Sequence, residues 1–181
     1  SELEDVLRRS RDLLRRLKEL LERLLETVRK LIEEAKELLK KILEDSRKLI
    51  REVEEMVRRG DIDDDTLRRI KEENRRLNKE LRDRVKKLEE DIRRLIKKLE
   101  DEVRKAKEDN ERLLKKLRDD EDSEEIRRVI KESKDLSRAL EETVRRVERK
   151  IEDLLRRIKE EAERVIKESE KLIEDAERAT K

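Results

Sequence analysis

Apolar residues recur at alternating intervals of three and four along almost the whole chain, and this spacing constrains the fold most strongly. It places the apolar side chains on one face of an α-helix. Only two short segments interrupt the pattern, at 60–63 and 119–123. The first stripe consists of Leu3, Leu7, Ser10, Leu14, Leu17, Leu21, Leu24, Val28, Leu31, Ala35, Leu38, Ile42, Ser46, Leu49, Val53 and Met56. The sequence therefore predicts an all-α protein with three helices of about 55 residues each.

The first interruption combines a helix stop signal with a helix start signal. Gly60 follows the last periodic residue, where glycine enters the left-handed conformation without a Cβ penalty. Asp63 is then predicted to be the N-cap of the next helix. With Asp63 in that place, Ile62 and Leu67 have the spacing of a hydrophobic staple.

The second interruption has no glycine, but its residues also favour the start of a helix. Either Asp122 or Ser123 can serve as the N-cap, and two glutamates follow in the first turn, where the helix dipole favours negative charge. We therefore expect one domain over 1–181, with helices at about 2–59, 64–118 and 124–179 and loops at 60–63 and 119–123.

Two sets of polar residues occupy positions within the apolar stripes: Ser10, Asn110 and Ser133, and Ser46, Asn74 and Ser169. In both sets the first two residue numbers add to 120, and the third number exceeds the first by 123. This relation is expected when an up-helix, a down-helix and a second up-helix lie side by side. We predict a long, nearly straight, antiparallel up-down-up three-helix bundle, a coiled-coil-like rod with two Ser–Asn–Ser layers. Either handedness of the three-helix arrangement is compatible with these layers.

The same register places apolar residues together along the rest of the stripes. It groups Leu21 with Leu99 and Val144, and it makes further layers of Val28/Ile92/Ile151 and Leu39/Leu81/Ala162. Along the first helix, a second apolar residue flanks the stripe, one position before it early in the helix and one position after it later. The stripe therefore drifts relative to a strict seven-residue repeat. The drift indicates a period of about 3.6 residues and little supercoiling.

A buried serine or asparagine without a partner costs about 1–3 kcal/mol, so polar residues in one layer are expected to satisfy one another. Such layers would select one register and one helix order. The alternative is that these residues are half-exposed at the edges of the stripes. Asn78 and Ser137 fit adjacent layers, Thr27 and Thr143 fit the stripe margins, and their participation stays open.

Composition argues against most kinds of chemistry. The chain has no histidine or cysteine to ligate zinc or act as a near-neutral base, so we expect no enzyme activity, cofactor or metal. It has no aromatic residue for base stacking, and 55 basic and 53 acidic residues are interspersed, so we expect no nucleic-acid partner. No apolar run approaches ~18 residues and the first residues lack a signal-peptide pattern, which predicts neither a membrane span nor a leader.

One acidic run has the spacing of a calcium-binding loop. Asp61, Asp63, Asp65 and Glu72 fall at positions 1, 3, 5 and 12 of that pattern. Position 6 should be glycine but is Thr66, and the helical stripe has already resumed at the next residue. We interpret the run as helix capping with dipole compensation.

Taken together, these residues resemble computationally designed, parametrically generated three-helix bundles with buried hydrogen-bond layers. The resemblance covers the whole chain and rests on the single Gly60 loop, the start at 122–126, the Leu/Ile/Val core, the Lys/Arg/Glu/Asp surface and the two polar layers. The natural spectrin-type repeat has a similar topology, but it normally buries tryptophan, which this chain lacks.

The resemblance implies no natural biochemical activity and a role as a structural scaffold that tests stable bundle folding. We expect a highly stable, soluble monomer that needs no partner and that is cytoplasmic if expressed recombinantly. One alternative is a helical interaction module or self-associating bundle, in which flanking leucines and isoleucines contact another helix. A lipid-surface amphipathic protein is a further alternative, although tryptophan and phenylalanine anchors are absent.

Overall fold

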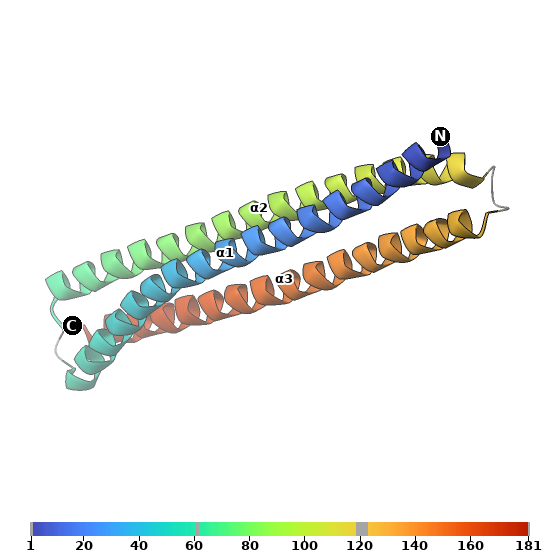
Figure 1. The fold of residues 1–181 in the computed structure, drawn as a ribbon. Helices are drawn as coiled ribbons and strands as arrows, with labels where there is room; N and C mark the ends of the chain where they lie inside the picture. The colour runs from blue at the N-terminus through green and yellow to red at the C-terminus, as the bar shows by residue number, and fades with distance from the viewer. Residues whose placement is uncertain (1, 61, 119–122, 181) are drawn as a thin grey trace. The chain divides into compact units, whose positions relative to one another are not determined.

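A computed structural model describes residues 2–60, 62–118 and 123–180. These residues form three helices, α1 at Glu2–Arg59, α2 at Asp64–Leu117 and α3 at Glu124–Ala179 (Figure 1). The helices contain 58, 54 and 56 residues, and no strand occurs within the described ranges. The all-α prediction is therefore confirmed, and α2 ends one residue earlier than the periodicity indicated.

The chain folds into two compact units, and each unit contains a part of all three helices. The first unit consists of Ser1–Arg29 and Ile92–Glu152, and the second of Lys30–Asp91 and Asp153–Lys181. In the first unit the beginning of α1 packs with the end of α2 and the beginning of α3. In the second unit the remaining parts pack in the complementary way. Within each unit α2 is therefore antiparallel to α1 and α3, which confirms the up-down-up three-helix bundle.

In both units, residues that the sequence assigned to one layer are buried in the same part of the core. Leu21, Leu99 and Val144 are buried in one apolar cluster of the first unit. In the second unit Leu39, Leu81 and Ala162 are all buried and line the same groove. Aliphatic side chains and Met56 fill these clusters, and the chain has no aromatic residue.

Leu38 departs from its predicted place in the stripe. Its side chain is 47% exposed, whereas the neighbouring Leu39 is only 5% exposed. From Val28 to Leu39 there are eleven residues, close to three turns of an α-helix, so these two side chains project in nearly the same direction. Leu38 lies about 80° away from Val28 around the helix axis, because each residue turns the helix by about 100°. A strict alternation of three and four therefore assigns the wrong leucine to the core here.

The connection between α1 and α2 uses its residues as the sequence indicates. Gly60 has a φ of 69°, and its N–H donates to the carbonyl oxygens of Met56 and Val57 at 3.1 Å each. The Asp63 carboxylate accepts a hydrogen bond from the Thr66 N–H at 2.7 Å, the geometry of an N-cap. Ile62 is buried in the apolar cluster against which Leu67 also packs, as expected for a hydrophobic staple.

The other predicted cap and the acidic run are only partly described. The Ser123 carbonyl accepts the N–H of Arg127 at 3.1 Å, which places Ser123 directly before α3. Asp122, the alternative cap, and Asp61, the first position of the calcium-loop pattern, lie outside the described residues. Asp65 lies within the first turn of α2, as the capping interpretation requires.

Replacing Asp63 by alanine is expected to lower the thermal midpoint, because the Thr66 N–H loses its acceptor. Asp63→Asn should retain most of the stability, since an amide oxygen also caps a helix. The hydrogen bond from Thr66 lowers the pKa of Asp63, so this contribution is present above the ordinary pKa and is lost as the pH falls through the lowered value. Thermal unfolding followed by circular dichroism at pH 7 and pH 2 checks this order, and equal midpoints for Asp63→Ala and the parent chain at pH 7 would contradict it.

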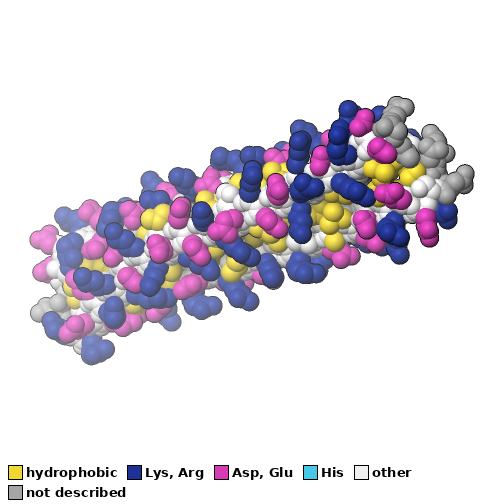
Figure 2. Space-filling model, viewed as in Figure 1, with side chains coloured by type: hydrophobic (Ala, Val, Ile, Leu, Met, Phe, Trp, Pro, Cys, Tyr) yellow, Lys and Arg dark blue, Asp and Glu magenta, His cyan; other side chains and the backbone are white. Residues whose placement is uncertain are grey.

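The surface is a mixture of both charges. In the face shown in Figure 2, lysine and arginine side chains alternate with carboxylates over the helices, and apolar side chains show between them. Many ion pairs join residues three or four apart on one helix, such as Arg59 with Glu55 at 2.7 Å. Exposed pairs of this kind contribute little to stability. Within the described ranges, none of the helices has a stretch long and apolar enough to cross a membrane.

Candidate functional site

A buried polar cluster joins all three helices in the first unit. Ser10 of α1 donates a hydrogen bond to Oδ1 of Asn110 in α2 at 3.2 Å. Nδ2 of Asn110 in turn donates to Oγ of Ser137 in α3 at 3.2 Å. The side chains of Ser10 and Asn110 are 0% and 2% exposed. One asparagine therefore uses both ends of its amide to connect the two neighbouring helices.

The partner of Asn110 on α3 is one turn away from the predicted one. Ser133 is buried in the same unit, but the Asn110 amide donates to Ser137. In an α-helix the Cα–Cβ bond tilts toward the N-terminus. In two antiparallel helices these tilts are opposite, so the Asn110 side chain leans toward the C-terminal side of Ser133. The predicted register took account of the helix axes but omitted this lean.

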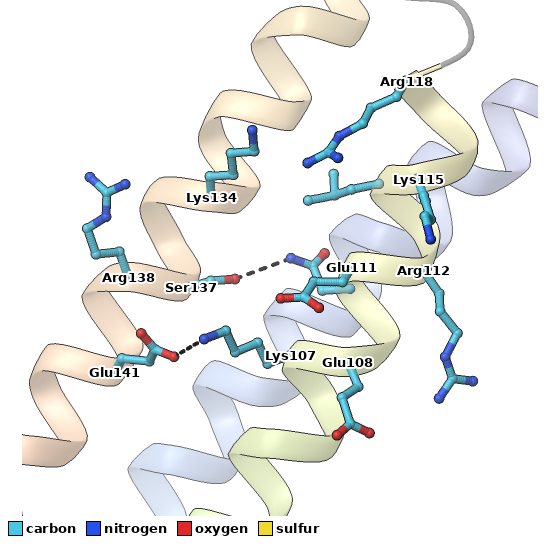
Figure 3. A pocket seen from close by; sticks show the side chains of 12 residues that line it. Lys107, Glu108, Glu111, Arg112, Lys115, Arg118, Lys134, Ser137, Arg138 and Glu141 are labelled. Carbon is cyan, nitrogen blue, oxygen red and sulfur yellow. Dashed lines mark hydrogen bonds and ion pairs between the residues drawn. The ribbon is translucent and has the colours of Figure 1, made fainter.

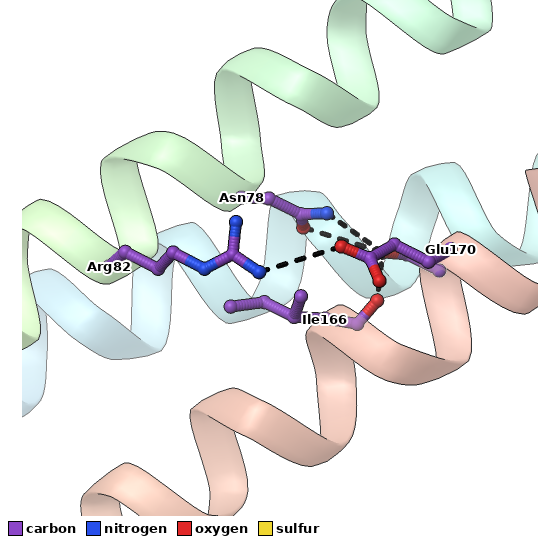
Figure 4. A network of polar contacts seen from close by, with 5 residues as sticks. Asn78, Arg82, Ile166 and Glu170 are labelled. Atoms are coloured by element: carbon purple, nitrogen blue, oxygen red, sulfur yellow. Dashed lines mark hydrogen bonds and ion pairs between the residues drawn. The ribbon is translucent and has the colours of Figure 1, made fainter.

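The second unit shows the same displacement in its buried polar cluster. Asn78 of α2 donates to Oγ of Ser169 in α3 at 3.2 Å, and the Ser169 hydroxyl also lies 3.3 Å from Oδ1 of Asn78 and 2.8 Å from the Ile166 carbonyl. Figure 4 shows Asn78 and Arg82 of α2 facing Ile166 and Glu170 of α3. The predicted partner of Ser169 was Asn74, whereas the hydrogen-bonded residue is Asn78, one turn further along α2.

The remaining members of the second predicted layer are buried without completing it. Asn74 is 8% exposed and lines a groove between α2 and α3. Ser46 is 2% exposed, and its Oγ has no hydrogen-bond partner within the described part of the chain. A buried hydroxyl in this condition costs about 1–3 kcal/mol. The two polar clusters therefore differ, since among the described residues only the cluster of the first unit links α1 to α3 through buried serine and asparagine side chains and Ser137.

The two threonines at the stripe margins do not take part in these clusters. The Thr27 hydroxyl donates to the Arg23 carbonyl at 2.9 Å, and the Thr143 hydroxyl donates to the Ala139 carbonyl at 2.8 Å. Both bonds are to the preceding turn of the same helix, which is the local alternative available to any helical threonine. Spacing alone could not separate these residues from Ser137.

Each polar cluster lies beneath a groove between α2 and α3. In the first unit the groove has a volume of about 630 Å³ and contains Asn110 and Ser137 in its lining (Figure 3). In the second unit the groove has a volume of about 530 Å³ and contains Asn74 and Asn78. Charged side chains make up most of the lining of both grooves.

Ion pairs follow the α2–α3 interface at regular intervals. Lys71 pairs with Glu177, Lys159 with Glu89, and Lys107 with Glu141. In each pair the two residue numbers add to 248, and successive α2 members are 18 residues apart, which is five turns of about 3.6 residues. The hydrogen bond and charge of Glu141 raise the pKa of Lys107, and those of Lys107 lower the pKa of Glu141.

One further α2–α3 pair has residue numbers that add to 248, but both of its side chains are acidic: Glu100 and Glu148. Burial, together with the hydrogen bond and charge of Glu100, raises the pKa of Glu148 to about 7. The charge of Glu152 raises it further, and that of Arg145 opposes the increase. This pair was not predicted from the sequence, although its residue numbers also add to 248, as those of the Lys–Glu pairs do.

The contribution of Glu148 to the free energy of unfolding is expected to decrease as the pH rises from about 4.5 to above 7. The folded state retains a proton on Glu148 that the unfolded state releases near its ordinary pKa of 4.5, so this contribution is largest below pH 4.5 and is lost through pH 7. Glu148 is only partly buried, and solvent screening limits the loss to about 1 kcal/mol. Glu148→Gln should remove this part of the pH dependence, whereas Glu142→Gln, at an exposed position, should retain it.

Urea unfolding at pH 5 and pH 8 measures the effect as a difference between the variants. If Glu148→Gln and the parent chain lose the same unfolding free energy between these pH values, the like-charge pair does not form.

The arrangement offers hydrogen bonding and charge pairing as its chemistry. Within the described residues, no three acidic side chains are grouped so that they could hold a metal ion. The hydrogen bonds between helices in the two polar clusters join amides and hydroxyls. The clusters therefore have the properties of structural connections between helices.

Comparisons with known proteins agree with the fold. No family model and no curated protein matches the chain. Among solved structures, the chain is similar to a computationally designed three-helix bundle, with 27% sequence identity and a TM-score of 0.59. The similarity covers 98% of this chain and 94% of that one. The chain therefore resembles a designed bundle over nearly its full length. Four of its buried polar side chains are hydrogen-bonded between helices, namely Ser10, Asn78, Asn110 and Ser169.

Proposed function

We propose that the chain is a designed-type structural scaffold, without a natural biochemical activity, whose buried polar residues select the register of its helices. The observation that carries this proposal is the connection of Asn110 to Ser10 on one neighbouring helix and to Ser137 on the other. The restricted composition and the similarity to a designed three-helix bundle support it.

Register selection follows from the energetics of the surrounding core. Leucine, isoleucine and valine fill positions above and below the polar cluster, so a slipped helix would still bury apolar side chains. The Asn110 amide would then face aliphatic groups, and each stranded polar group would cost about 1–3 kcal/mol. The polar cluster therefore penalises the alternatives more than it stabilises the correct arrangement.

Disulfide cross-linking tests register selection, because the chain has no cysteine of its own. Cysteines at Lys107 and Glu141 report the correct α2–α3 register, since these side chains pair. Cysteines at Lys107 and Glu148 report a slip of seven residues. Each cysteine pair is compared in two backgrounds. One is the parent chain. The other, the apolar background, carries alanine in place of the buried serines and Ser137, and leucine in place of the buried asparagines.

The parent background should give the first cross-link alone under reversible oxidation. The apolar background should give the second one as well, or a mixture of helix orders. If the apolar background retains a single cross-link and a single set of amide resonances, the polar residues do not select the register, and the proposal is wrong.

The scaffold is proposed to be monomeric. Leu38 is the one large apolar side chain that is exposed among the described residues, and a single leucine is far smaller than the patches that drive association. Sedimentation equilibrium over a wide concentration range tests this part. A mass near 22.2 kDa throughout supports a monomer. A concentration-dependent dimer would favour the self-associating alternative.

A further inference from the structure

The groove between α2 and α3 in the first unit carries an excess of positive charge. Three carboxylates line it, from Glu108, Glu111 and Glu141. The six cationic side chains in its lining are Lys107, Arg112, Lys115, Arg118, Lys134 and Arg138. The charged side chains of the lining therefore sum to a formal charge of +3.

Most of these cations are not engaged in ion pairs. Lys107 pairs with Glu141, and Arg112 pairs with Asp109 at 3.6 Å. The other four have no ion pair within the described part of the chain. Figure 3 shows Arg118 and Lys134 extending into the space between the two helices. Two walls of the groove thus offer charge to a ligand that lies between them.

The polar cluster beneath the groove adds neutral donors to this charge. Ser137 accepts a hydrogen bond from Asn110, and its own hydroxyl proton has no acceptor among the described residues. The Asn110 amide has a second N–H besides the one directed to Ser137. Cations combined with O–H and N–H donors form a lining that suits an anion with several oxygen atoms.

The corresponding groove of the second unit provides an internal comparison. Four cations and three carboxylates line it, and two of those cations, Lys71 and Arg82, pair with Glu177 and Glu170. The Ser169 hydroxyl there lies within hydrogen-bonding distance of both the Ile166 carbonyl and Asn78. This groove therefore has a similar volume and the same fold around it, but among the described residues two of its cations lack an ion pair, against four in the first groove.

We propose that the α2–α3 groove of the first unit binds a small, multiply charged phosphate anion. Its volume of about 630 Å³ accommodates two or three linked phosphate groups. The lining has no aromatic side chain on which a nucleobase could stack, because the chain contains none. The ligand is therefore a pyrophosphate-like group rather than a nucleotide, and this site is independent of the scaffold role.

A titration of the ¹⁵N-labelled full chain with pyrophosphate, followed by NMR, tests the proposal. At low ionic strength we expect saturable shifts of the amides at Lys115, Lys134 and Ser137, with a dissociation constant of about 1 mM or tighter. Raising the salt concentration to about 0.2 M should weaken binding, since the rim cations are exposed. Adenosine diphosphate should bind no more tightly than pyrophosphate.

Two matched double variants separate a site from general attraction. Arg118→Gln with Lys134→Gln removes two charges from the proposed groove, and Arg75→Gln with Lys79→Gln removes two from the second groove. The first variant should weaken binding by about tenfold and the second by less than twofold. Ser137→Ala should weaken binding by a few-fold without a change in net charge, and circular dichroism verifies that each variant is folded.

Equal weakening by the two double variants would overturn the proposal, because it would show that only net charge matters. Shifts spread evenly over both units, or the lack of saturation in the parent chain, would overturn it as well.

Discussion

Replacing Leu39 by alanine should reduce the unfolding free energy by about 2–4 kcal/mol, whereas the same change at Leu38 should alter it by less than about 0.5 kcal/mol. Leu39 is 5% exposed and lines the same groove as Leu81 and Ala162, so truncation leaves a cavity in a packed layer. Leu38 is 47% exposed, and its truncation removes few contacts.

The pair is informative because the two residues are adjacent and chemically identical. Helix propensity favours alanine slightly and equally at both positions, so it cancels in the comparison. Urea unfolding followed by circular dichroism measures both values. A larger loss for Leu38→Ala than for Leu39→Ala would mean that α1 follows the simple alternation of three and four, with its rotation in the bundle changed accordingly.

Ser46→Ala and Ser10→Ala are expected to change stability in opposite directions. Ser46 buries a hydroxyl without a partner, so its removal should stabilise the fold by about 1–2 kcal/mol. Ser10 donates to Asn110, so its removal leaves a buried carbonyl oxygen without its donor and should destabilise the fold by about 1 kcal/mol. Both substitutions gain the same few tenths of a kcal/mol in helix propensity.

Unfolding in guanidinium gives both free energies from one protocol. The control is Ser10→Ala combined with Asn110→Leu and Ser137→Ala, which removes all three polar partners and should recover or exceed the parent stability. If Ser46→Ala and Ser10→Ala shift the unfolding midpoint by the same amount, the two serines have equivalent surroundings. That result would contradict the claim that the polar clusters of the two units differ.

Sequence reasoning identified the features of this fold that depend on backbone periodicity. Gly60 and Asp63 marked the first turn because only particular residues tolerate a positive φ or cap a helix end. The grouping of Leu21, Leu99 and Val144 in one apolar cluster agrees with the arithmetic of antiparallel helices of similar length joined by short loops.

The parts that escaped prediction depend on side-chain direction and on angles that accumulate along a helix. Asn110 contacts Ser137, one turn from Ser133, because antiparallel side chains lean in opposite directions. Asn78 replaces Asn74 as the partner of Ser169 for the same reason. Leu38 lies outside the core because it is rotated about 80° around the helix axis from Val28, and an alternating pattern of three and four does not account for this rotation. Pairing between carboxylates, as between Glu148 and Glu100, leaves no hydrophobic signature in the sequence.

The central claim is that Asn110 connects three helices through its side-chain amide, and nuclear Overhauser effects from its two Nδ2 protons test this most directly. In the labelled parent chain these protons should show contacts to the β protons of both Ser10 and Ser137, and the proton directed to Ser137 should exchange slowly with solvent. Contacts to the β protons of Ser133 without those of Ser137, or rapid exchange with water of the proton directed to Ser137, would contradict the connection.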